Sequence, residues 1–188
     1  EKYDFVYDQV VCFGELISTS IVSEYLQQHG IKNEWKDARS LIKTDSTYRD
    51  AQVDWDETQE LIMKEINKEA LTITQGFIGA DSNNFTTTLG REGSDYTAAI
   101  FAYCLNALDV TIWKDVPGVL NGDPRVFQNT QLLNQISYEE AIELAFFGAS
   151  VIHPKTLQPL QRKEIPLFVK SFLNPLDKGT EVSKGHKI

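Results

Sequence analysis

The stretch "TTTLGREGSDYTAA" gathers hydroxyl, glycine and charged residues directly before an apolar helical run. In an ordinary helix start, Ser94 or Asp95 is the N-cap, and Gly90 and Gly93 provide the turn geometry. Capping does not require Arg91, however. An arginine at a helix N-terminus, where free N–H groups favour anions, can hold a carboxylate through two parallel hydrogen bonds. Asp95 can accept from an ammonium group, so the pair suits an amino acid.

A second polar segment, "WKDVPGVLNGDPR", follows a predicted strand. Its Pro-Gly and Gly-Asp-Pro steps are turn signals, so one interpretation is a loop that only reverses the chain. In the other interpretation, Lys114 and Arg125 face phosphates, near Asp115, while backbone groups hold a base or ribose. In "CFGE", Glu15 follows a predicted strand and a glycine, where it lies near the helix dipole or faces a ligand amine. The three histidines lack metal-ligand spacing, so no protein-held metal is expected.

Apolar periodicity predicts strands that alternate with helices. We expect strands ending at Val11 and over 31–38, 40–45, 70–80, 109–116 and 166–172, and helices over 16–30, 56–69, 95–107 and 137–149, the last with a Ser137/Glu140 capping box. This order predicts an α/β fold, a three-layer α/β/α sandwich around a mainly parallel sheet. Ligands of such sheets bind beyond the carboxyl ends of the strands, which here are the loops after Val11, Phe77 and Trp113.

Composition excludes several classes of protein. The chain has 188 residues, the size of one domain, and its net charge of −9 argues against a nucleic-acid partner. No apolar run approaches the roughly 20 residues needed to span a bilayer, so no membrane partner is expected. Cys12 and Cys104 lie in apolar segments and are expected to be buried free thiols, which suits the cytoplasm.

The motifs "CFGE", "WKDAR", "TQGFIG", "TTTLGREGSD", "DVPGVLNGDPR", "FGASVIHPKT" and "FLNPLDKGT" together resemble the catalytic domain of aspartate kinases, within the amino-acid kinase superfamily. The lysine-sensitive class is the most similar. The resemblance implies a partial catalytic domain over residues 1–182 and a tail over 183–188. It also implies ATP-dependent phosphorylation of the β-carboxylate of L-aspartate, with Mg²⁺, in lysine, threonine and methionine biosynthesis. The full-length protein is expected to be a homo-oligomer.

Residue by residue, the resemblance assigns Arg91 to a substrate carboxylate and Glu15 to the substrate amine. Thr88, Ser94 and Asp95 complete the aspartate pocket. The positions that it assigns to the nucleotide are Lys114, Asp115, Gly118, Leu120, Arg125, Ser150 and Val151.

Three residues depart from the family pattern: Ser150 replaces a lysine, Leu120 a tyrosine and Glu92 a glycine. The family's Lys-Phe-Gly-Gly-Thr-Ser strand and its regulatory domains are absent from these 188 residues. We therefore expect a fold incomplete at the N-terminus and a chain that is inactive alone. Two alternatives stay open: a non-catalytic fragment that is structural or binds a small molecule, and a kinase of another small acid.

Overall fold

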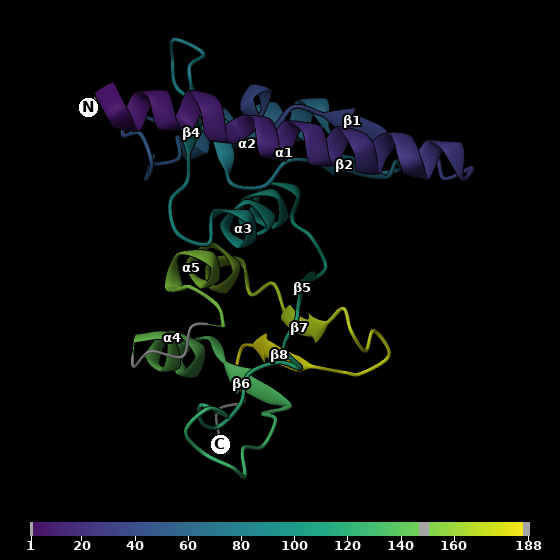
Figure 1. The fold of residues 1–188 in the computed structure, drawn as a ribbon, viewed down its shortest axis with the longest axis vertical. Helices are drawn as coiled ribbons and strands as arrows, with labels where there is room; N and C mark the ends of the chain where they lie inside the picture. The colour runs from purple at the N-terminus through teal and green to yellow at the C-terminus, as the bar shows by residue number, and fades with distance from the viewer. Residues whose placement is uncertain (1, 147–150, 186–188) are drawn as a thin grey trace. The chain divides into compact units, whose positions relative to one another are not determined.

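The computed structural model describes residues 2–146 and 151–185 (Figure 1). The chain divides into two compact units, Glu1–Thr97 and Ala98–Ile188, called here the first and second unit. Both units mix helices with strands and contain parallel strand pairs, so the predicted α/β class is confirmed. The expected single domain over residues 1–182 stays a prediction.

The first unit contains two small sheets beside its helices. Its elements are α1 (Lys2–Gln28), β1 (Glu34–Lys36), the 3-10 turn η1 (Ala38–Ser40), α2 (Trp55–Glu65), β2 (Thr72–Thr74), β3 (Ile78–Ala80), β4 (Thr86–Thr88) and the start of α3 (Gly93–Leu105). Strands β1 and β2 pair in parallel. Strands β3 and β4 pair antiparallel because a five-residue loop joins them. The strand predicted over 70–80 is thus two strands, interrupted at 75–77.

Helix α1 replaces the predicted strand that ends at Val11, and that prediction is wrong. Adjacent valines favour a strand by their β-branched side chains. The burial pattern is helical instead: Asp8 and Cys12, one turn apart, are buried, whereas Val10 is exposed. Gly14 lies within the helix, so it does not end a strand.

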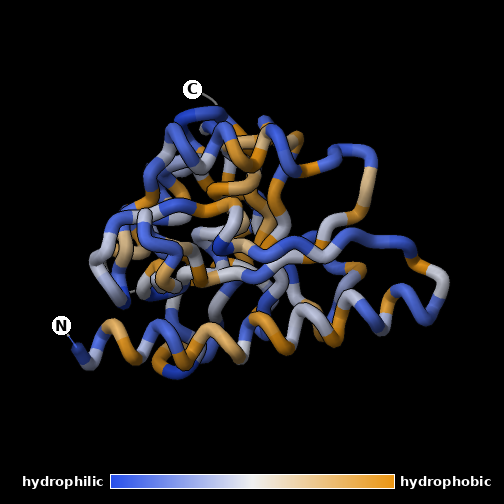
Figure 2. Tube along the Cα trace, turned by 90° about the horizontal axis from the view of Figure 1, so that it is seen from above, coloured by the Kyte–Doolittle hydropathy of each residue, from blue (hydrophilic) through white to orange (hydrophobic). Residues whose placement is uncertain are grey.

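Large hydrophobic side chains are exposed on α1 from Tyr3 to Tyr25, and Figure 2 shows hydrophobic residues recurring along this helix. The exposed large hydrophobic side chains are Tyr3, Val6, Val10, Phe13, Ile17, Ile21, Val22 and Tyr25. By length and composition alone the 27-residue helix is able to cross a membrane, so the expectation that no such segment exists is wrong. Soluble core helices and signal sequences pass the same test, so this is weak evidence for a membrane.

The second unit is built on one four-stranded sheet. Its elements, after the end of α3, are β5 (Val110–Lys114), β6 (Gln135–Ser137), α4 (Tyr138–Phe146), α5 (Pro154–Lys163), β7 (Leu167–Ser171) and β8 (Thr180–Ser183). The strand order is β5-β7-β8-β6, with β5 parallel to β7, β6 parallel to β8, and β7 antiparallel to β8. The described strands therefore form three sheets rather than one, and two strand pairs are antiparallel.

The core of the second unit lies between this sheet and its helices. Leu157 and Leu160 of α5 and Val169 of β7 are fully buried in one cluster. The predicted capping box is confirmed: the Ser137 N–H donates to the Glu140 carboxylate at 2.7 Å, and the Glu140 N–H donates to Ser137 Oγ at 3.1 Å.

Both cysteines are buried free thiols, as predicted. Burial raises the pKa of the Cys104 thiol to about 11. This thiol therefore stays protonated at neutral pH and is a poor nucleophile.

Candidate functional sites

The loop that carries Arg91 connects β4 to α3 within the first unit. Gly90 has a φ of 78°, and a Cβ there would stand 2.5 Å from Asp50 Oδ1, so only glycine fits. Arg91 and Ser94 are both exposed. The helix begins at Gly93, so Ser94 and Asp95 lie in its first turn, and the prediction of an N-cap at either residue is wrong.

A tight turn at residues 75–77 packs against the start of α3. Phe77 has a φ of 72°, and the Ile78 N–H donates to the Gly76 carbonyl at 2.9 Å, which makes a strained γ-turn. The Phe77 N–H donates to Thr97 Oγ1 at 2.9 Å, and a Cβ on Gly93 would stand 2.7 Å from the Phe77 ring. Sequence reasoning assigned no site residue here, although the flanking glycines in "TQGFIG" signal a close backbone approach.

Glu15 is half-buried on the inner side of α1. Four residues later, Thr19 accepts hydrogen bonds from Gln75 Nε2 at 2.8 Å and Trp35 Nε1 at 3.1 Å. On the other side, Cys12 packs in one cluster with Ile78. These contacts hold the Glu15 segment of α1 along the 75–77 turn.

Thr88 lies beneath the loop rather than on its surface. The residue is fully buried. Its hydroxyl donates to Asp8 Oδ1 at 2.8 Å, and its N–H donates to Asp8 Oδ2 at 2.9 Å. The hydroxyl proton of Thr88 is therefore used within the protein.

The "WKDAR" motif is structural. Arg39 holds Asp37 with two short contacts, Nε to Oδ1 at 3.0 Å and Nη2 to Oδ2 at 2.6 Å. Its Nη1 also donates to Thr86 Oγ1 at 3.3 Å, which joins η1 to β4. Burial by itself would raise the pKa of the Asp37 carboxyl, but the Arg39 hydrogen bonds outweigh it and lower that pKa.

The segment that follows β5 is organised around Thr180. Gly118, with a φ of 146°, lies so close that a Cβ there would stand 2.5 Å from Thr180 Oγ1. The Val119 N–H donates to Thr180 Oγ1 at 2.8 Å, and that hydroxyl donates to the Leu133 carbonyl at 2.6 Å. The "DVPG" and "DKGT" motifs, which lie far apart in sequence, therefore meet at one buried hydroxyl.

The other predicted nucleotide residues lie in varied settings. Lys114 ends β5 and is half-buried, Asp115 is exposed, and Leu120 forms a bridge with Leu132. Val151 is half-buried, and Ser150 lies outside the described residues.

Arg125 pairs with a near neighbour in its own loop. Its side chain is 87% exposed, and Nη2 lies 2.8 Å from Asp123 Oδ2. Hydrogen bonds from Arg125 lower the pKa of the Asp123 carboxyl, and the same contacts raise the pKa of Arg125. An exposed pair of this kind is weak, so a ligand phosphate can compete for Arg125.

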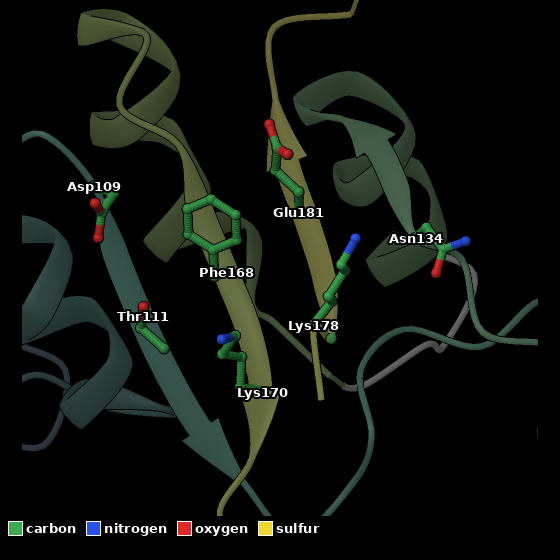
Figure 3. Close-up of a pocket in the computed structure, with 8 residues that line it drawn as sticks. Asp109, Thr111, Asn134, Phe168, Lys170, Lys178 and Glu181 are labelled. Carbon is green, nitrogen blue, oxygen red and sulfur yellow. The ribbon is translucent and has the colours of Figure 1, made fainter. Parts of the chain in front are cut away.

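A cavity of about 410 Å³ lies on a face of the second unit's sheet (Figure 3). Thr111, Phe168 and Glu181 are cross-strand neighbours in its floor, and Lys170 and Lys178 lie around them. Among the predicted site residues that the structure describes, none lines this cavity. Over residues 2–146 and 151–185, no three His, Cys, Asp or Glu side chains are placed to hold a metal ion.

Residues 2–171 match the Amino acid kinase family, and the chain belongs to this family. Among curated relatives, it is 44% identical over 179 residues to lysine-sensitive aspartokinase 3 of Escherichia coli K12, covering 93% of this chain and 40% of that protein. The crystal structure of E. coli aspartokinase III with aspartate and ADP superposes with a TM-score of 0.93 at 41% identity, covering 98% of this chain and 42% of that one. Aspartate kinase of Clostridium acetobutylicum gives a TM-score of 0.80 at 30% identity, covering 96% and 39%.

These similarities confirm the predicted resemblance to aspartate kinases and its lysine-sensitive class. The chain spans about 40% of the length of the E. coli relative.

Proposed function

We propose that this chain belongs to an enzyme that transfers the γ-phosphoryl group of ATP to the β-carboxylate of L-aspartate. The observation that carries the proposal is the exposed Arg91 beside the first turn of α3, in a chain 41% identical to an aspartokinase solved with aspartate and ADP. This reaction opens lysine, threonine and methionine biosynthesis. A cytoplasmic homo-oligomer, without nucleic-acid or membrane partners, is part of the same proposal.

The first unit supplies the groups that suit aspartate. Arg91 offers a planar fork of donors for a carboxylate, and the N–H groups at the start of α3 favour the same charge. Ser94, exposed in the first turn, adds a hydroxyl. Glu15 supplies the negative charge that an α-ammonium group requires.

The second unit supplies the groups that suit a nucleotide. Lys114 and Arg125 place positively charged side chains on a loop whose backbone is fixed by the contact of Gly118 and Val119 with Thr180. Such cations hold phosphates and neutralise charge that develops during transfer.

The described residues offer no dedicated metal cage, but the exposed carboxylate of Asp115 lies next to Lys114. This fits Mg²⁺ that arrives with the nucleotide, because Mg²⁺ keeps several waters and takes one or two carboxylates beside substrate phosphates. Asp115 would hold the ion, which when bound neutralises phosphate charge.

The decisive experiment compares aspartate and ADP binding by titration calorimetry in wild type and Arg91→Ala. It uses the 188-residue chain and the complete product of its gene. Loss of a charge-assisted bidentate contact should cost about 2–4 kcal/mol, which is roughly 30- to 1,000-fold in the aspartate Kd. The ADP Kd should stay unchanged. Arg162→Ala, at an exposed position on α5, is the matched control.

An aspartate Kd that stays within about twofold of wild type in Arg91→Ala would mean that the carboxylate site is elsewhere. A coupled ADP-release assay of the gene product with aspartate, glutamate and carbamate tests the two alternatives. Turnover with another acid in preference to aspartate would identify a different kinase. Binding of aspartate without turnover would identify a non-catalytic protein.

A further inference from the structure

The carboxylate of Asp8 is fully buried on the inner side of α1. It accepts three hydrogen bonds: from Thr88 Oγ1 at 2.8 Å, from the Thr88 N–H at 2.9 Å and from the Arg49 N–H at 3.0 Å. A buried polar group is retained at low cost only when its hydrogen bonds are made. This carboxylate therefore holds α1 to the last residue of β4.

A second polar contact, next to that of Asp8, also joins α1 to β4. Gln9 exchanges two hydrogen bonds with the backbone of Thr86, from Gln9 Nε2 to the Thr86 carbonyl at 2.8 Å and from the Thr86 N–H to Gln9 Oε1 at 3.1 Å. Consecutive residues of α1 thus bind alternate residues of β4. Such directional contacts fix the register of α1 against β4, since a slip of α1 by one residue would break all of them.

These contacts between α1 and β4 connect the helix that carries Glu15 to the strand that leads into the Arg91 loop. Glu15 lies seven residues after Asp8, two helical turns along nearly the same face of α1. Arg91 lies three residues after Thr88. The contact of Asp8 with Thr88 therefore contributes, together with the Thr19 contacts, to the placement of Glu15 relative to the Arg91 loop.

Elsewhere on α1, directional contacts hold the helix to segments other than β4: Thr19, four residues after Glu15, accepts from Gln75 Nε2 at 2.8 Å and from Trp35 Nε1 at 3.1 Å. Cys12 makes apolar contacts with Ile78, which are not directional. The outward side of the helix is exposed. The other buried polar residue of α1, Ser23, donates to Asn33 Oδ1 at 2.6 Å and holds the far end of the helix.

We propose that Asp8 is a positioning residue for aspartate recognition: through Thr88 it sets the register of α1, and hence the placement of Glu15 against the Arg91 loop. The inference rests on the proposed function of this site. It also gives Thr88 an indirect role, because the buried hydroxyl of Thr88 donates to Asp8.

The test measures aspartate and ADP affinity in Asp8→Asn and Thr88→Val, well below the melting temperature of each variant. Both substitutions nearly preserve side-chain size and remove the charge-assisted bond between hydroxyl and carboxylate. Displacing Glu15 weakens its charge-assisted contact with the α-ammonium group, so we expect the aspartate Kd to rise at least about tenfold. The ADP Kd should stay within about twofold. Thr88→Ser, which keeps the donor, should restore aspartate affinity.

Ser23→Ala is the matched control, because it removes a buried hydrogen bond from the same helix away from β4. It should lower the melting temperature without changing the aspartate Kd. The positioning role would be wrong, and Asp8 only structural, if Asp8→Asn lost aspartate and ADP affinity equally. The same conclusion would follow if Ser23→Ala and Asp8→Asn changed the aspartate Kd equally. If Asp8→Asn does not fold, Gln9→Ala takes its place, because it removes the neighbouring contacts with Thr86 without touching Thr88. It should likewise raise the aspartate Kd and leave the ADP Kd unchanged, and an unchanged aspartate Kd would overturn the positioning role.

Arg91→Ala separates this inference from the proposed function. If wild type binds aspartate, Arg91→Ala weakens that binding as expected, and both Asp8→Asn and Thr88→Val bind aspartate normally, only the positioning role is wrong. If Thr88→Val alone weakens binding, Thr88 contacts aspartate directly and the positioning role is again wrong. If wild type does not bind aspartate, both proposals are wrong.

Discussion

Gly76 lies directly against Ser94: a Cβ built on Gly76 would stand 2.9 Å from both Cα and Cβ of Ser94 and 3.0 Å from its Oγ. The 75–77 turn and the first turn of α3 are therefore in contact through backbone atoms. Since Cα and Cβ of Ser94 cannot rotate away as the end of a flexible side chain can, any substituent on Gly76 must displace one of the two segments.

Gly76→Ala should accordingly disturb aspartate binding. A shift of a few tenths of an ångström at Ser94 moves the hydroxyl and the N–H groups of the helix start and weakens their hydrogen bonds to a substrate carboxylate, so we expect the aspartate Kd to rise about tenfold. The ADP Kd should remain near wild type. Titration calorimetry measures both. Gly185→Ala, whose Cβ would stand 3.2 Å from Ser137 Cβ in the second unit, is the control. Normal aspartate affinity in Gly76→Ala would place Ser94 outside the pocket.

Gly14 presents the opposite case. It lies inside α1, and a Cβ there would meet nothing within 4 Å. Gly14→Ala should therefore stabilise the protein by about 0.5–1 kcal/mol, because alanine loses less backbone entropy in a helix. For a chain of this size, this corresponds to a rise in Tm of roughly 1–4 °C. Thermal unfolding checks it, and a lower Tm would mean that α1 is not helical at Gly14.

The positions of α1 and the 75–77 turn explain what the sequence could and could not predict. The capping box at Ser137 and the strand β5 were predictable because their signals are local. The hydrogen bond between Thr88 and Asp8, by contrast, joins residues 80 positions apart, and no local sequence pattern encodes such a contact. Val10 and Val11 favour a strand locally, but the packing of Asp8 and Cys12 makes that segment a helix, since tertiary contacts override weak propensities.

Glu92 shows how a departure from a family pattern becomes interpretable with the structure. Its φ is 53°, a left-handed conformation that costs a non-glycine residue about 1–2 kcal/mol. This accounts for the glycine that the family pattern carries at this position. One Glu92 carboxylate oxygen is also buried without a hydrogen-bond partner.

Glu92→Gly should therefore stabilise the folded state, even though glycine loses more backbone entropy on folding. We expect a net gain of about 0.5–1 kcal/mol, measured as the free energy of unfolding in urea. Asn84→Gly is the matched control: Asn84 has a similar φ of 61°, but asparagine tolerates that conformation, so its stability should hardly change. A destabilised Glu92→Gly variant would mean that the carboxylate has a favourable partner in solution.

The Asp123–Arg125 pair makes a prediction about nucleotide affinity. The guanidinium of Arg125 donates hydrogen bonds of 2.8–3.2 Å to the carboxylate of Asp123. If Arg125 binds a phosphate, Asp123 competes with it. Asp123→Asn should then lower the ADP Kd a few-fold, whereas Arg125→Ala should raise it about tenfold or more. Nucleotide titration at low salt checks both variants, and opposite or absent changes would remove Arg125 from the nucleotide site.

Asp81 makes the last prediction, which concerns acid stability. Its Oδ1 accepts from the N–H groups of Asn83 at 2.9 Å and Phe85 at 3.0 Å, and its Oδ2 accepts from the hydroxyls of Ser46 and Tyr48, both at 3.0 Å. Burial alone would raise the pKa of this carboxyl. The four hydrogen bonds outweigh burial and hold the pKa below its usual value of 3.8.

Because the folded-state pKa of Asp81 is below the unfolded one, ionised Asp81 stabilises the fold fully above the unfolded pKa. That stabilisation is lost as the pH falls through the folded pKa. Asp81→Asn should be less stable than wild type by about 1–3 kcal/mol near neutral pH, since it weakens a buried set of charge-assisted bonds. The difference should shrink as the pH is lowered from about 5 to about 2. Urea unfolding of both proteins across this range measures it. A difference that stays constant, or grows in acid, would mean that Asp81 is not ionised in the folded protein.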